Sequence, residues 1–582
     1  MVISKIVIKG FRNFINTEID FSNVSLIIGK NDIGKSNLLY ALRILFDKKI
    51  SEADLELTDS DFNVYSSDGI IQITAYLSEI TETCLVACDA FKGNISKDDT
   101  CVIRYQNEKD EDGYKIYIGQ DETKLQEVGS RRYIKRLSLY YVDSQRDLIS
   151  FYKQEKKRLL DSSKDRLSEK EITDDEISKA SLKEDISSLN GKICGLNYIS
   201  NALNQVNDVL KTISSSYTNN KVKFMSVEPD VEKMLEKVEI TSFTESGDVA
   251  MGGDGRNNQI YLATWLTQRE LENDDSNVMM FAIEEPESHL HPHQQRVLAN
   301  YLMSFERGQV FITSHSPQIV SRFSPNCIIR LSEENKNVVA FCGKNAIVKD
   351  SFDKFGYRLN PISSEIFYSD GVLLVEGVSE VLFYKALAEA KDLGQDKYNF
   401  SIISVEGIGF RPYIELCKSL GIPFSIRTDN DIFSSKKDKS ALRGISRCFG
   451  ILKDYFDAGD IADLMKEYND HQVLLEWDGS ALDIPKESID FSLEMRCGLE
   501  KFDIFLSDID LENDILNSEL NPVLKKHYSV ENEDVLISKM KERKAENMFD
   551  FINNANTKTA LKKVNKDSII KPLLATLAKV KV

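Results

Sequence analysis

Two groups of residues in this chain of 582 residues have types and spacings that suit phosphate chemistry. The first group fits the pattern G-x-x-x-x-G-K-S, in which glycines let backbone N–H groups close around phosphates. The lysine of this pattern reaches the β- and γ-phosphates, and the serine hydroxyl holds Mg²⁺. We therefore predict a nucleoside triphosphate site formed by Gly29, Lys30, Asn31, Asp32, Ile33, Gly34, Lys35, Ser36 and Asn37.

The second group is acidic and follows short apolar runs. Glu376 and Glu380 come after one such run, and Asp429 and Asp431 come after another. Clustered carboxylates that side chains cannot all neutralise are most simply explained by a divalent metal ion. Acids that only cap helices would account for Asp429, but poorly for the whole set.

A further acidic pair, Glu284 and Glu285, follows the apolar run Val278–Ile283 and precedes Pro286. Two carboxylates at the tip of a buried strand suit the holding of a metal ion and the activation of water. His315 follows the next apolar run, where it could sense a γ-phosphate or cap the following helix.

Alternating histidines nearby raise the question of a zinc site. His289, His291 and His293 have the alternation, but Pro292 interrupts the run and no cysteine lies near. We therefore do not expect zinc at these residues.

These side chains need strands and helices to position them. Apolar runs with β-branched residues precede the glycine loop, Glu284, His315, Glu376 and Asp429, and they predict buried strands. Leucines at helical spacing after the loop predict a helix, which completes the strand–loop–helix context of a phosphate site. Alternating strands and helices around the second acidic group predict a parallel sheet with its acids on one edge.

Other stretches set the organisation of the chain. Alternation in Met1–Phe21 and in three runs up to Ile118 predicts antiparallel strands. Charged sequence with leucines at helical spacing over Phe151–Ser216 predicts helices that pair with another subunit or form a solvated arm. The glycine-rich stretch Gly252–Asn258 leads into a predicted helix, and Asn345–Asn360 has the character of a linker.

The composition limits the partners. The 74 Lys and Arg residues against 93 Asp and Glu residues give a net charge of −19, so the surface as a whole does not attract DNA. Any contact with nucleic acid must use local basic patches or bridging metal ions. Nine cysteines without a C-x-x-C pair argue against a zinc ribbon and a disulfide framework. With neither a signal peptide nor a membrane-spanning run, we expect a cytoplasmic protein that makes no membrane contact.

The order of the motifs resembles that of ABC-type ATPases of the SMC, RecF and OLD (overcoming lysogenization defect) group. The chain carries GKNDIGKSN, Gln145-Arg146, GGDG, FAIEEPESHLHP and TSHSP in that order. The resemblance implies that Glu284 and Glu285 form the Walker B motif, with Glu285 as the catalytic base, and that His315 is the switch histidine.

The same resemblance implies a Q-loop residue at Gln145 and a signature loop around Gly253, Asp254 and Gly255. This loop lacks the serine of the usual signature pattern. In this group the signature loop of one subunit closes on the nucleotide of another. ATP use therefore implies at least a dimer.

The acidic strands after the linker resemble a Toprim domain, with Glu-Gly after the first strand and Asp-x-Asp after the third. An ATPase followed by Toprim resembles the OLD-family nucleases over nearly the whole chain. The likeness extends to Asp510-Leu511-Glu512 within a strand-like run, Ile504–Leu511. It also implies that Lys544 is the active-site lysine, with the neighbouring Lys541 and Lys539 as alternatives.

The fold class that follows is α/β. We predict an ABC-type ATPase domain with an inserted helical dimerisation region, followed by a Toprim nuclease domain built on a Rossmann-like parallel sheet. The predicted boundaries are 1–150 and 221–350 for the ATPase, 151–220 for the helical region and 361–582 for Toprim, with a helical insertion at about 434–501.

The resemblance implies an ATP-binding, metal-dependent DNA endonuclease whose cutting of double-stranded DNA is regulated by nucleotide. Two Mg²⁺ ions, with Mn²⁺ or Ca²⁺ as alternatives, would bridge the scissile phosphate. Glu376 would also act as acid or base, and Lys544 would stabilise the transition state. The implied metal ligands are Glu376, Glu380, Asp429, Asp431, Asp510 and Glu512, with Ser36 at the nucleotide.

In length and motif spacing the chain is most similar to the nuclease subunits of Gabija anti-phage systems and to OLD-type effectors of retrons. This implies a homo-oligomer that works with a second defence subunit, either a helicase or a reverse transcriptase with its RNA/DNA. Topoisomerases and primases also use Toprim, but the chain shows neither zinc-ribbon cysteines nor a domain that presents a strand-cleaving tyrosine. An SMC- or RecF-like DNA-binding scaffold or repair protein, whose acids bind metal without cutting, stays open.

Overall fold

The computed structural model describes residues 1–580 except 112, 145–157, 159, 214–230, 232–233, 235–242, 245–246, 251–253, 273–276, 306–307, 344–362, 407–408, 435–438 and 480–482. The chain divides into two compact units. The first consists of Met1–Tyr141, Val278–Glu287 and Pro292–Val582, and the second of Val142–Asn277 and Ser288–His291. The predicted linker Asn345–Asn360 lies outside the described residues.

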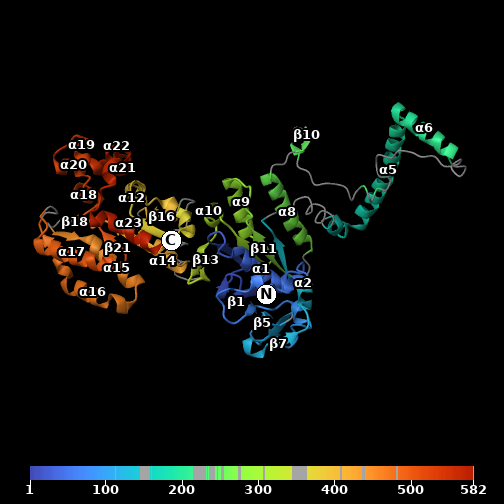
Figure 1. Ribbon diagram of the computed structural model, residues 1–582, viewed down its shortest axis with the longest axis horizontal. Helices are drawn as coiled ribbons and strands as arrows, with labels where there is room; N and C mark the ends of the chain where they lie inside the picture. Colours follow the sequence, from blue (N-terminus) through green and yellow to red (C-terminus); the bar gives the residue numbers. More distant parts are fainter. Residues whose placement is uncertain are drawn as a thin grey trace. The chain divides into compact units, whose positions relative to one another are not determined.

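The first unit begins with a six-stranded antiparallel sheet in the order β2-β1-β4-β5-β6-β7 (Figure 1). The alternating sequence predicted such strands, because successive side chains of a strand point to opposite faces. In β1, for example, Ile6 and Ile8 are buried whereas Lys9 is exposed. The strands are β1 (Val2–Phe11), β2 (Phe14–Asp20), β4 (Ile70–Ser78), β5 (Cys101–Glu108), β6 (Tyr114–Gly119) and β7 (Gln126–Val128).

A second six-stranded sheet has the order β14-β13-β3-β12-β11-β8. Its central strands β13, β3, β12 and β11 are parallel, so their carboxyl ends lie on one edge. Glu284 is the last residue of β11, and the glycine loop and His315 follow β3 and β12, as the apolar runs predicted. The strands are β3 (Val24–Ile28), β8 (Leu137–Val142), β11 (Val278–Glu284), β12 (Gln309–Thr313), β13 (Ile328–Glu334) and β14 (Asn337–Cys342).

Helix α1 (Lys35–Phe46) packs against both sheets, through β5 and β12. Its leucines at helical spacing, Leu38, Leu39, Leu42 and Leu45, are fully buried. Each buried leucine side chain contributes about 2 kcal/mol to the packing of the helix. This burial fixes the helix whose first turn carries Lys35 and Ser36.

The C-terminal half of the first unit contains the predicted parallel sheet, in the order β16-β15-β17-β21. Its strands are β15 (Gly371–Val375), β16 (Phe400–Ser404), β17 (Phe424–Thr428) and β21 (Ile504–Leu506). An apolar core joins this sheet to α12 (Val378–Ala390), α18 (Leu511–Leu516), α20 (Glu533–Glu542), α21 (Lys544–Asn553), α22 (Ala555–Leu561) and α23 (Asp567–Lys579). The α/β fold class with parallel sheets is confirmed.

The predicted strand Ile504–Leu511 is wrong beyond Leu506. The side chain of Asp510 accepts a hydrogen bond from the backbone N–H of Asn513, which makes Asp510 the cap of α18. Glu512 therefore lies in a helix, not on a strand.

The segment between β17 and β21 is mostly helical, as predicted, with α15 (Arg443–Tyr455), α16 (Ala458–His471) and α17 (Lys486–Glu500). It also forms a three-stranded antiparallel sheet that the sequence analysis did not predict. This sheet consists of β18 (Ile432–Ser434), β19 (Lys439–Leu442) and β20 (Glu476–Asp478). Strands of three or four residues are too short to leave a clear alternating pattern.

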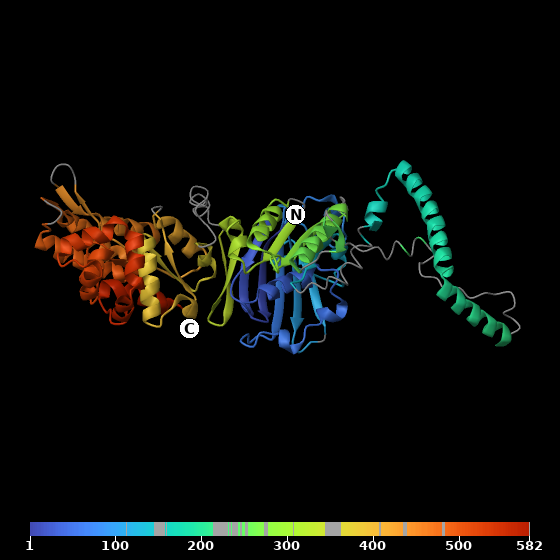
Figure 2. The ribbon, with the colours of Figure 1, turned by 90° about the horizontal axis from the view of Figure 1, so that it is seen from above.

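The second unit contains the long helices α5 (Glu169–Cys194) and α6 (Asn197–Ile213), drawn from teal to green in Figures 1 and 2. The helical prediction for this region is confirmed for its described residues. The unit also holds α8 (Asp254–Glu272) and the short pair β9 (Phe243–Thr244) and β10 (Gly247–Ala250). Among the helices that the structure describes, none is long and apolar enough to cross a membrane.

Candidate nucleotide and metal sites

The glycine loop connects β3 to α1 with two glycines at positive φ. Gly29 has φ 153° and Gly34 has φ 114°, which other residues rarely adopt. A Cβ atom at Gly34 would also lie 2.2 Å from the side chain of Asn13. The loop therefore needs glycine at this position for both its backbone turn and its packing.

Lys35 is the first residue of α1, and its side chain curls back into the loop. Its Nζ donates to the carbonyl oxygens of Gly29 and Lys30, at 3.0 and 2.6 Å. Burial lowers the pKa of Lys35 to about 8, although nearby acids, Glu285 first among them, act in the opposite direction. The loop thus holds a cation where a triphosphate needs one.

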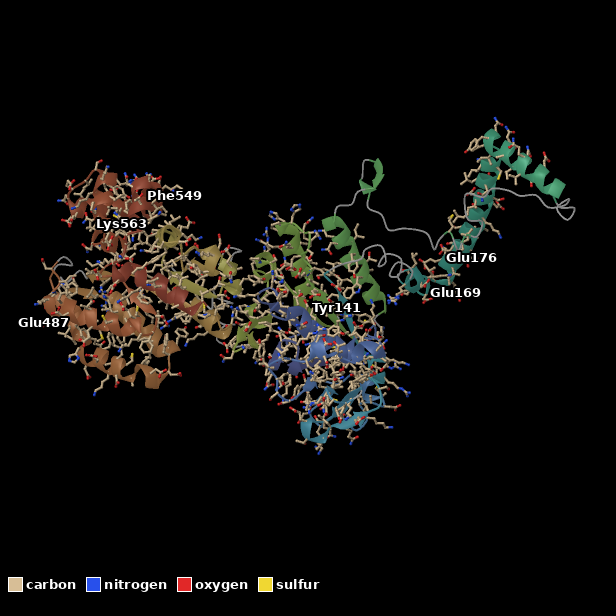
Figure 3. All side chains as sticks on the ribbon, viewed as in Figure 1. Tyr141, Glu169, Glu176, Glu487, Phe549 and Lys563 are labelled. Atoms are coloured by element: carbon tan, nitrogen blue, oxygen red, sulfur yellow. The ribbon has the colours of Figure 1, made fainter. Side chains whose placement is uncertain are left out.

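Ser36 and Glu284 meet at the adjacent edge of the sheet. The Ser36 hydroxyl donates to one carboxylate oxygen of Glu284. The hydroxyl of Tyr141, which is labelled in Figure 3, donates to the other oxygen at 2.5 Å. A hydroxyl and a carboxylate held together suit the coordination of a nucleotide-bound Mg²⁺.

Glu285 and His315 face each other across the same edge, with Oε1 and Nε2 3.3 Å apart. Burial lowers the pKa of His315, and the charge of Lys35 lowers it further, so the imidazole is neutral at pH 7. The next helix, α10 (Pro317–Val320), is capped by Ser316, whose hydroxyl accepts from Gln318 N–H. The helix-cap alternative for His315 is therefore wrong.

Glu287 holds the backbone of His315 and the side chain of Ser314 in place. Its Oε1 accepts from the backbone N–H of His315 at 2.8 Å and from the Ser314 hydroxyl at 2.7 Å. Burial raises the pKa of Glu287. Nothing in the sequence pattern singled out this residue, because its partners lie on a different strand.

The other predicted nucleotide contacts are not tested by the described structure of the first unit. Gln145 and Gly253 lie outside the described residues. Asp254 and Gly255 begin α8 in the second unit. A Cβ atom at Gly255 would lie 2.3 Å from the carbonyl oxygen of His289, so glycine is needed there for close packing. The signature-loop assignment remains a prediction.

The turn between β1 and β2 adds residues that the sequence pattern did not single out. Arg12 Nη1 donates to Asn37 Oδ1 at 2.7 Å, and Asn37 Nδ2 donates to Asn13 Oδ1 at 2.9 Å. The Arg12 guanidinium also stacks 4.6 Å from the centre of the Tyr40 ring. The sequence signal that could have identified these residues was a polar Arg-Asn pair within a tight turn between two apolar strands.

The second acidic group gathers at the carboxyl edge of the parallel sheet. Glu376 directly follows β15, and Asp429 directly follows the neighbouring β17. The Oε1 atom of Glu376 accepts from the Asp429 N–H at 3.0 Å and from Arg447 Nη2 at 2.6 Å. The parallel sheet thus brings these two acids together, as predicted.

The remaining acids of this edge are buried or electrostatically linked. Burial raises the pKa of Asp431, and the charges of Glu376 and Asp429 add to the rise. Glu380 is buried in α12 and accepts from the Ser379 hydroxyl at 2.9 Å. The negative charges at this edge therefore disfavour one another's ionised forms.

Two lysines face the acids of α18. Lys541 Nζ lies 2.6 Å from Asp510, and Lys544 Nζ lies 3.4 Å from Glu512. Burial acts to raise the pKa of Asp510, but hydrogen bonds from Lys541 and Asn513 outweigh it and lower the pKa. Burial raises the pKa of Glu512, which Lys544 only partly offsets.

Of the two lysines, Lys544 also interacts with Asp429 and Glu380. Lys541 holds the helix-capping acid instead. The third alternative, Lys539, is positioned through its backbone carbonyl, which accepts from Asn547. Lys544 is therefore the lysine that faces the acids of the sheet edge.

The acidic edge offers carboxylate oxygens as possible metal ligands. Among the described residues, no three His, Cys, Asp or Glu side chains converge closely enough to hold a metal ion, at the acidic edge or at the histidines around Pro292. At the acidic edge, protein cations occupy the carboxylates: Arg447 on Glu376, Lys541 on Asp510 and Lys544 on Glu512. All donors are carboxylate oxygens, which are the ligands of Mg²⁺, Mn²⁺ and Ca²⁺. The chemistry of these donors fits a hard divalent cation.

Two family comparisons cover most of the chain. Residues 1–320 match the family described as AAA ATPase domain. Residues 367–431 match the family described as overcoming lysogenization defect protein-like, TOPRIM domain. An ATPase domain followed by an OLD-type Toprim domain is therefore confirmed, and the two domains imply the use of a nucleotide and of a divalent metal ion.

Similar individual proteins were also found. Endonuclease GajA of Bacillus cereus (strain VD045) is 28% identical, over 96% of this chain and 96% of its own length. OLD nuclease of Thermus scotoductus is 28% identical, over 26% of this chain and 30% of its own length. A crystal structure of an SMC head bound to the C-winged helix domain of ScpA aligns with 59% of this chain and 98% of its own, at 14% identity and a TM-score of 0.35.

Proposed function

Because the chain belongs to the AAA ATPase domain family and continues into an OLD-like TOPRIM domain, we propose that it is an ATP-binding, divalent-metal-dependent DNA endonuclease. The observation that carries the proposal is the meeting of Glu376 and Asp429 at adjacent strand tips, 3.0 Å apart from carboxylate to backbone N–H. The relative named as an endonuclease extends over 96% of both chains, which supports the same activity for this protein.

The residues at the acidic edge would divide the work of phosphodiester hydrolysis. A divalent metal ion would supply a Lewis acid and lower the pKa of the attacking water. Glu376 and Asp429 would hold it together with Glu380 and Asp431, and Asp510 and Glu512 would add oxygens from α18. Lys544, at 3.4 Å from Glu512, would place its charge near the phosphate as negative charge develops.

The nucleotide site would use its own set of residues, different from those of the cutting site. Lys35 would neutralise the phosphates, and Ser36 with Glu284 would hold the nucleotide-bound Mg²⁺. Glu285 would act as the general base, with His315 beside it at 3.3 Å. If Gly253, Asp254 and Gly255 form the signature loop, they complete this site in another subunit, so the active protein is at least a dimer.

The biological role that we propose is anti-phage defence in the cytoplasm, with cutting of double-stranded DNA regulated by ATP. A second subunit, a helicase or a reverse transcriptase with its RNA/DNA, would act with this chain. Support for the defence role comes from the relative named GajA, whose length this chain shares.

Incubation of purified protein with supercoiled plasmid tests the activity directly. We expect linear or nicked product with Mg²⁺ or Mn²⁺, and no product with EDTA or with Glu376→Gln. Relaxed but unbroken plasmid would point to a topoisomerase. Retention of the plasmid without any break would favour a DNA-binding scaffold and would overturn the nuclease proposal.

A further inference from the structure

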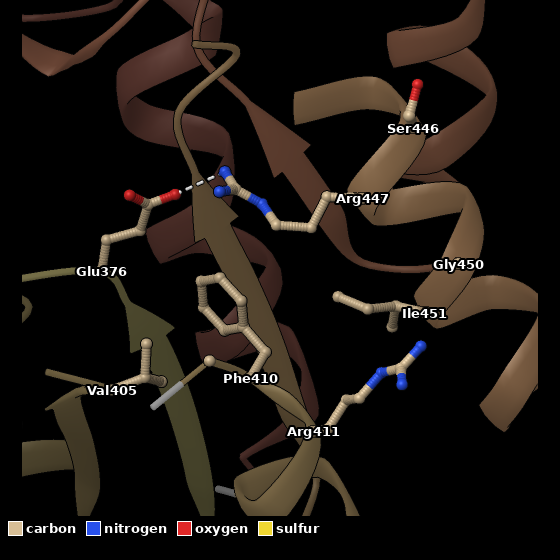
Figure 4. Close-up of a pocket in the computed structure, with 9 residues that line it drawn as sticks. Glu376, Val405, Phe410, Arg411, Ser446, Arg447, Gly450 and Ile451 are labelled. Atoms are coloured by element: carbon tan, nitrogen blue, oxygen red, sulfur yellow. Dashed lines mark hydrogen bonds and ion pairs between the residues drawn. The ribbon is translucent and has the colours of Figure 1, made fainter. Parts of the chain in front are cut away.

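A pocket of about 520 Å³ opens next to Glu376, between the start of α14 (Arg411–Ser419) and one face of α15 (Figure 4). Its walls are apolar at Val405, Phe410 and Ile451. Pockets that hold small ligands span roughly 300 to 1,000 Å³ and combine such walls with a few polar groups. The pocket therefore has the size and lining of a ligand site. Glu376, a proposed metal ligand, lies at one end of it.

Two arginines supply the charge of this pocket. Arg447 lies at the end that contains Glu376, where its Nη2 donates to Thr428 Oγ1 at 2.6 Å as well as to Glu376. Arg411 lines the pocket from α14, and it pairs with the exposed Asp454. Two guanidiniums and one carboxylate, Glu376, line the pocket, while the other partners of the arginines, Asp454 and Asp431, lie outside the lining. In a chain with a net charge of −19, this lining is the local excess of positive charge that DNA contact requires.

Gly450 gives an independent reason to regard the space as functional. It lies inside α15, where glycine destabilises a helix by about 1 kcal/mol relative to alanine. A Cβ atom at Gly450 would meet no heavy atom closer than Arg411 Nη2, at 3.9 Å, which is an ordinary contact. Packing therefore does not require glycine at position 450. The absence of a side chain there leaves room in the pocket.

We propose that this pocket binds the nucleotide unit of the DNA strand that adjoins the scissile phosphate. Arg447 and Arg411 would bind phosphate oxygens through their guanidinium forks, and the base would lie against Phe410 and Ile451. The inference rests on the proposed nuclease function and assigns it a substrate subsite.

The test compares Gly450→Leu with Gly450→Ala. The leucine side chain would extend into the pocket, whereas alanine adds only the Cβ that the space accepts. Anisotropy of a fluorescein-labelled DNA duplex in EDTA measures binding without cutting, and initial rates with Mg²⁺ give KM and kcat. We expect Gly450→Leu to raise the duplex Kd and the KM about tenfold, the loss expected from one unstacked base. Gly450→Ala should stay within about twofold of wild type, with a Tm at or above it.

A second pair of variants tests the charge. Arg411→Ala should raise the KM, whereas Arg443→Ala on α15 should not. Arg443 is a matched control because it is exposed to a similar extent, pairs with Glu476 and does not line the pocket. This pair decides the question if Gly450→Leu fails to fold.

The outcomes separate the subsite from the nuclease activity. Wild-type binding and KM in both Gly450→Leu and Arg411→Ala would overturn the subsite, whatever the cutting rate. If the wild-type protein does not cut, the nuclease proposal fails, and the EDTA binding assay still decides whether the pocket receives DNA. If Gly450→Leu weakens the binding of free thymidine 5′-monophosphate but not the binding of the duplex, the pocket serves free nucleotides and the DNA assignment is wrong.

Discussion

Arg427 Nη1 donates to Asp429 Oδ1 at 2.5 Å, and both side chains are buried within the sheet that carries the acidic edge. Arg427 Nη2 also reaches Asp514 at 3.1 Å, so one arginine neutralises two buried carboxylates. Removing Asp429 would leave Arg427 paired with Asp514, so the cost is that of one buried charge-assisted hydrogen bond, about 1.5–3 kcal/mol. Asp429 is therefore both a proposed metal ligand and part of the core of the Toprim domain.

The first prediction separates these two roles. Glu376→Gln should abolish cutting with an unchanged Tm, because Glu376 is partly exposed and its partner Arg447 reaches solvent. Asp429→Ala should abolish cutting and also lower the stability of the Toprim domain by about 2 kcal/mol, because a buried charge-assisted hydrogen bond is lost. Plasmid cleavage and thermal unfolding measure the two effects, with Glu389→Gln on the exposed face of α12 as the control. Wild-type cutting by Glu376→Gln would remove the Toprim site assignment.

The second prediction concerns the active-site lysine. Lys544→Ala should lower kcat by about 10²-fold or more, because Lys544 interacts with Glu512, Asp429 and Glu380 together. Lys541→Ala should act mainly on Asp510 and reduce kcat less, and Lys539→Ala should have little effect. Single-turnover cleavage rates rank the three variants. A larger loss in Lys541→Ala than in Lys544→Ala would reverse the assignment.

The third prediction assigns the acids of the ATPase site. Glu285→Gln should bind ATP and hydrolyse it at most at about one-hundredth of the wild-type rate, since it lacks the base beside His315. Glu284→Gln should weaken Mg²⁺-dependent binding, because Glu284 holds Ser36. Lys35→Ala should lose ATP binding. Binding is measured by calorimetry and turnover by phosphate release. Unchanged turnover in Glu285→Gln would make Glu284 or another residue the base.

The fourth prediction is a pH dependence at Lys35. Burial lowers the pKa of Lys35 to about 8, and only the protonated form attracts phosphate. Affinity for ATP should therefore fall as the pH rises above about 8, by up to tenfold per pH unit until the pKa of the complex is reached. This dependence of ATP affinity on pH should vanish in Lys35→Arg, whatever the absolute affinity of the variant, because arginine keeps its charge. Equal slopes in the two proteins between about pH 7 and pH 9 would contradict the assignment.

The fifth prediction links the nucleotide to cutting. Lys30 of the glycine loop pairs with Asp370, the residue before β15, at 2.6 Å. Tyr368 also donates to the carbonyl of Ser314, the residue before His315, at 3.5 Å. ATP at millimolar order should therefore suppress plasmid cleavage by wild type, and Lys35→Ala should cut without this suppression.

The control for the fifth prediction is constant free Mg²⁺ throughout the ATP titration. Equal inhibition of wild type and Lys35→Ala would show chelation rather than regulation. Stimulation of wild-type cutting by ATP would mean that the nucleotide activates the nuclease.

Much of the site could be predicted from the sequence, because the residues that define each motif lie close together along the chain. The strand before Gly29, the two glycines and the lysine with its helix lie within a few residues of one another, so spacing alone defines the motif. Apolar runs that end in acids predicted Glu284, Glu376 and Asp429 in the same way. At Ile504–Leu511 this reasoning failed, because the capping bond from Asn513 to Asp510 outweighed the apolar character of the run.

Only the tertiary structure decided which side chains meet. Arg447 is 71 positions from Glu376, and Tyr141 is 143 positions from Glu284, yet both pairs are hydrogen-bonded. Contacts of this kind leave no periodicity in the sequence, because they depend on strand order and on the face that a distant helix presents. Spacing and residue type determine what chemistry a segment can do. The packing of the sheets determines which cation reaches which acid, and thus that Lys544, rather than Lys541 or Lys539, faces the sheet edge.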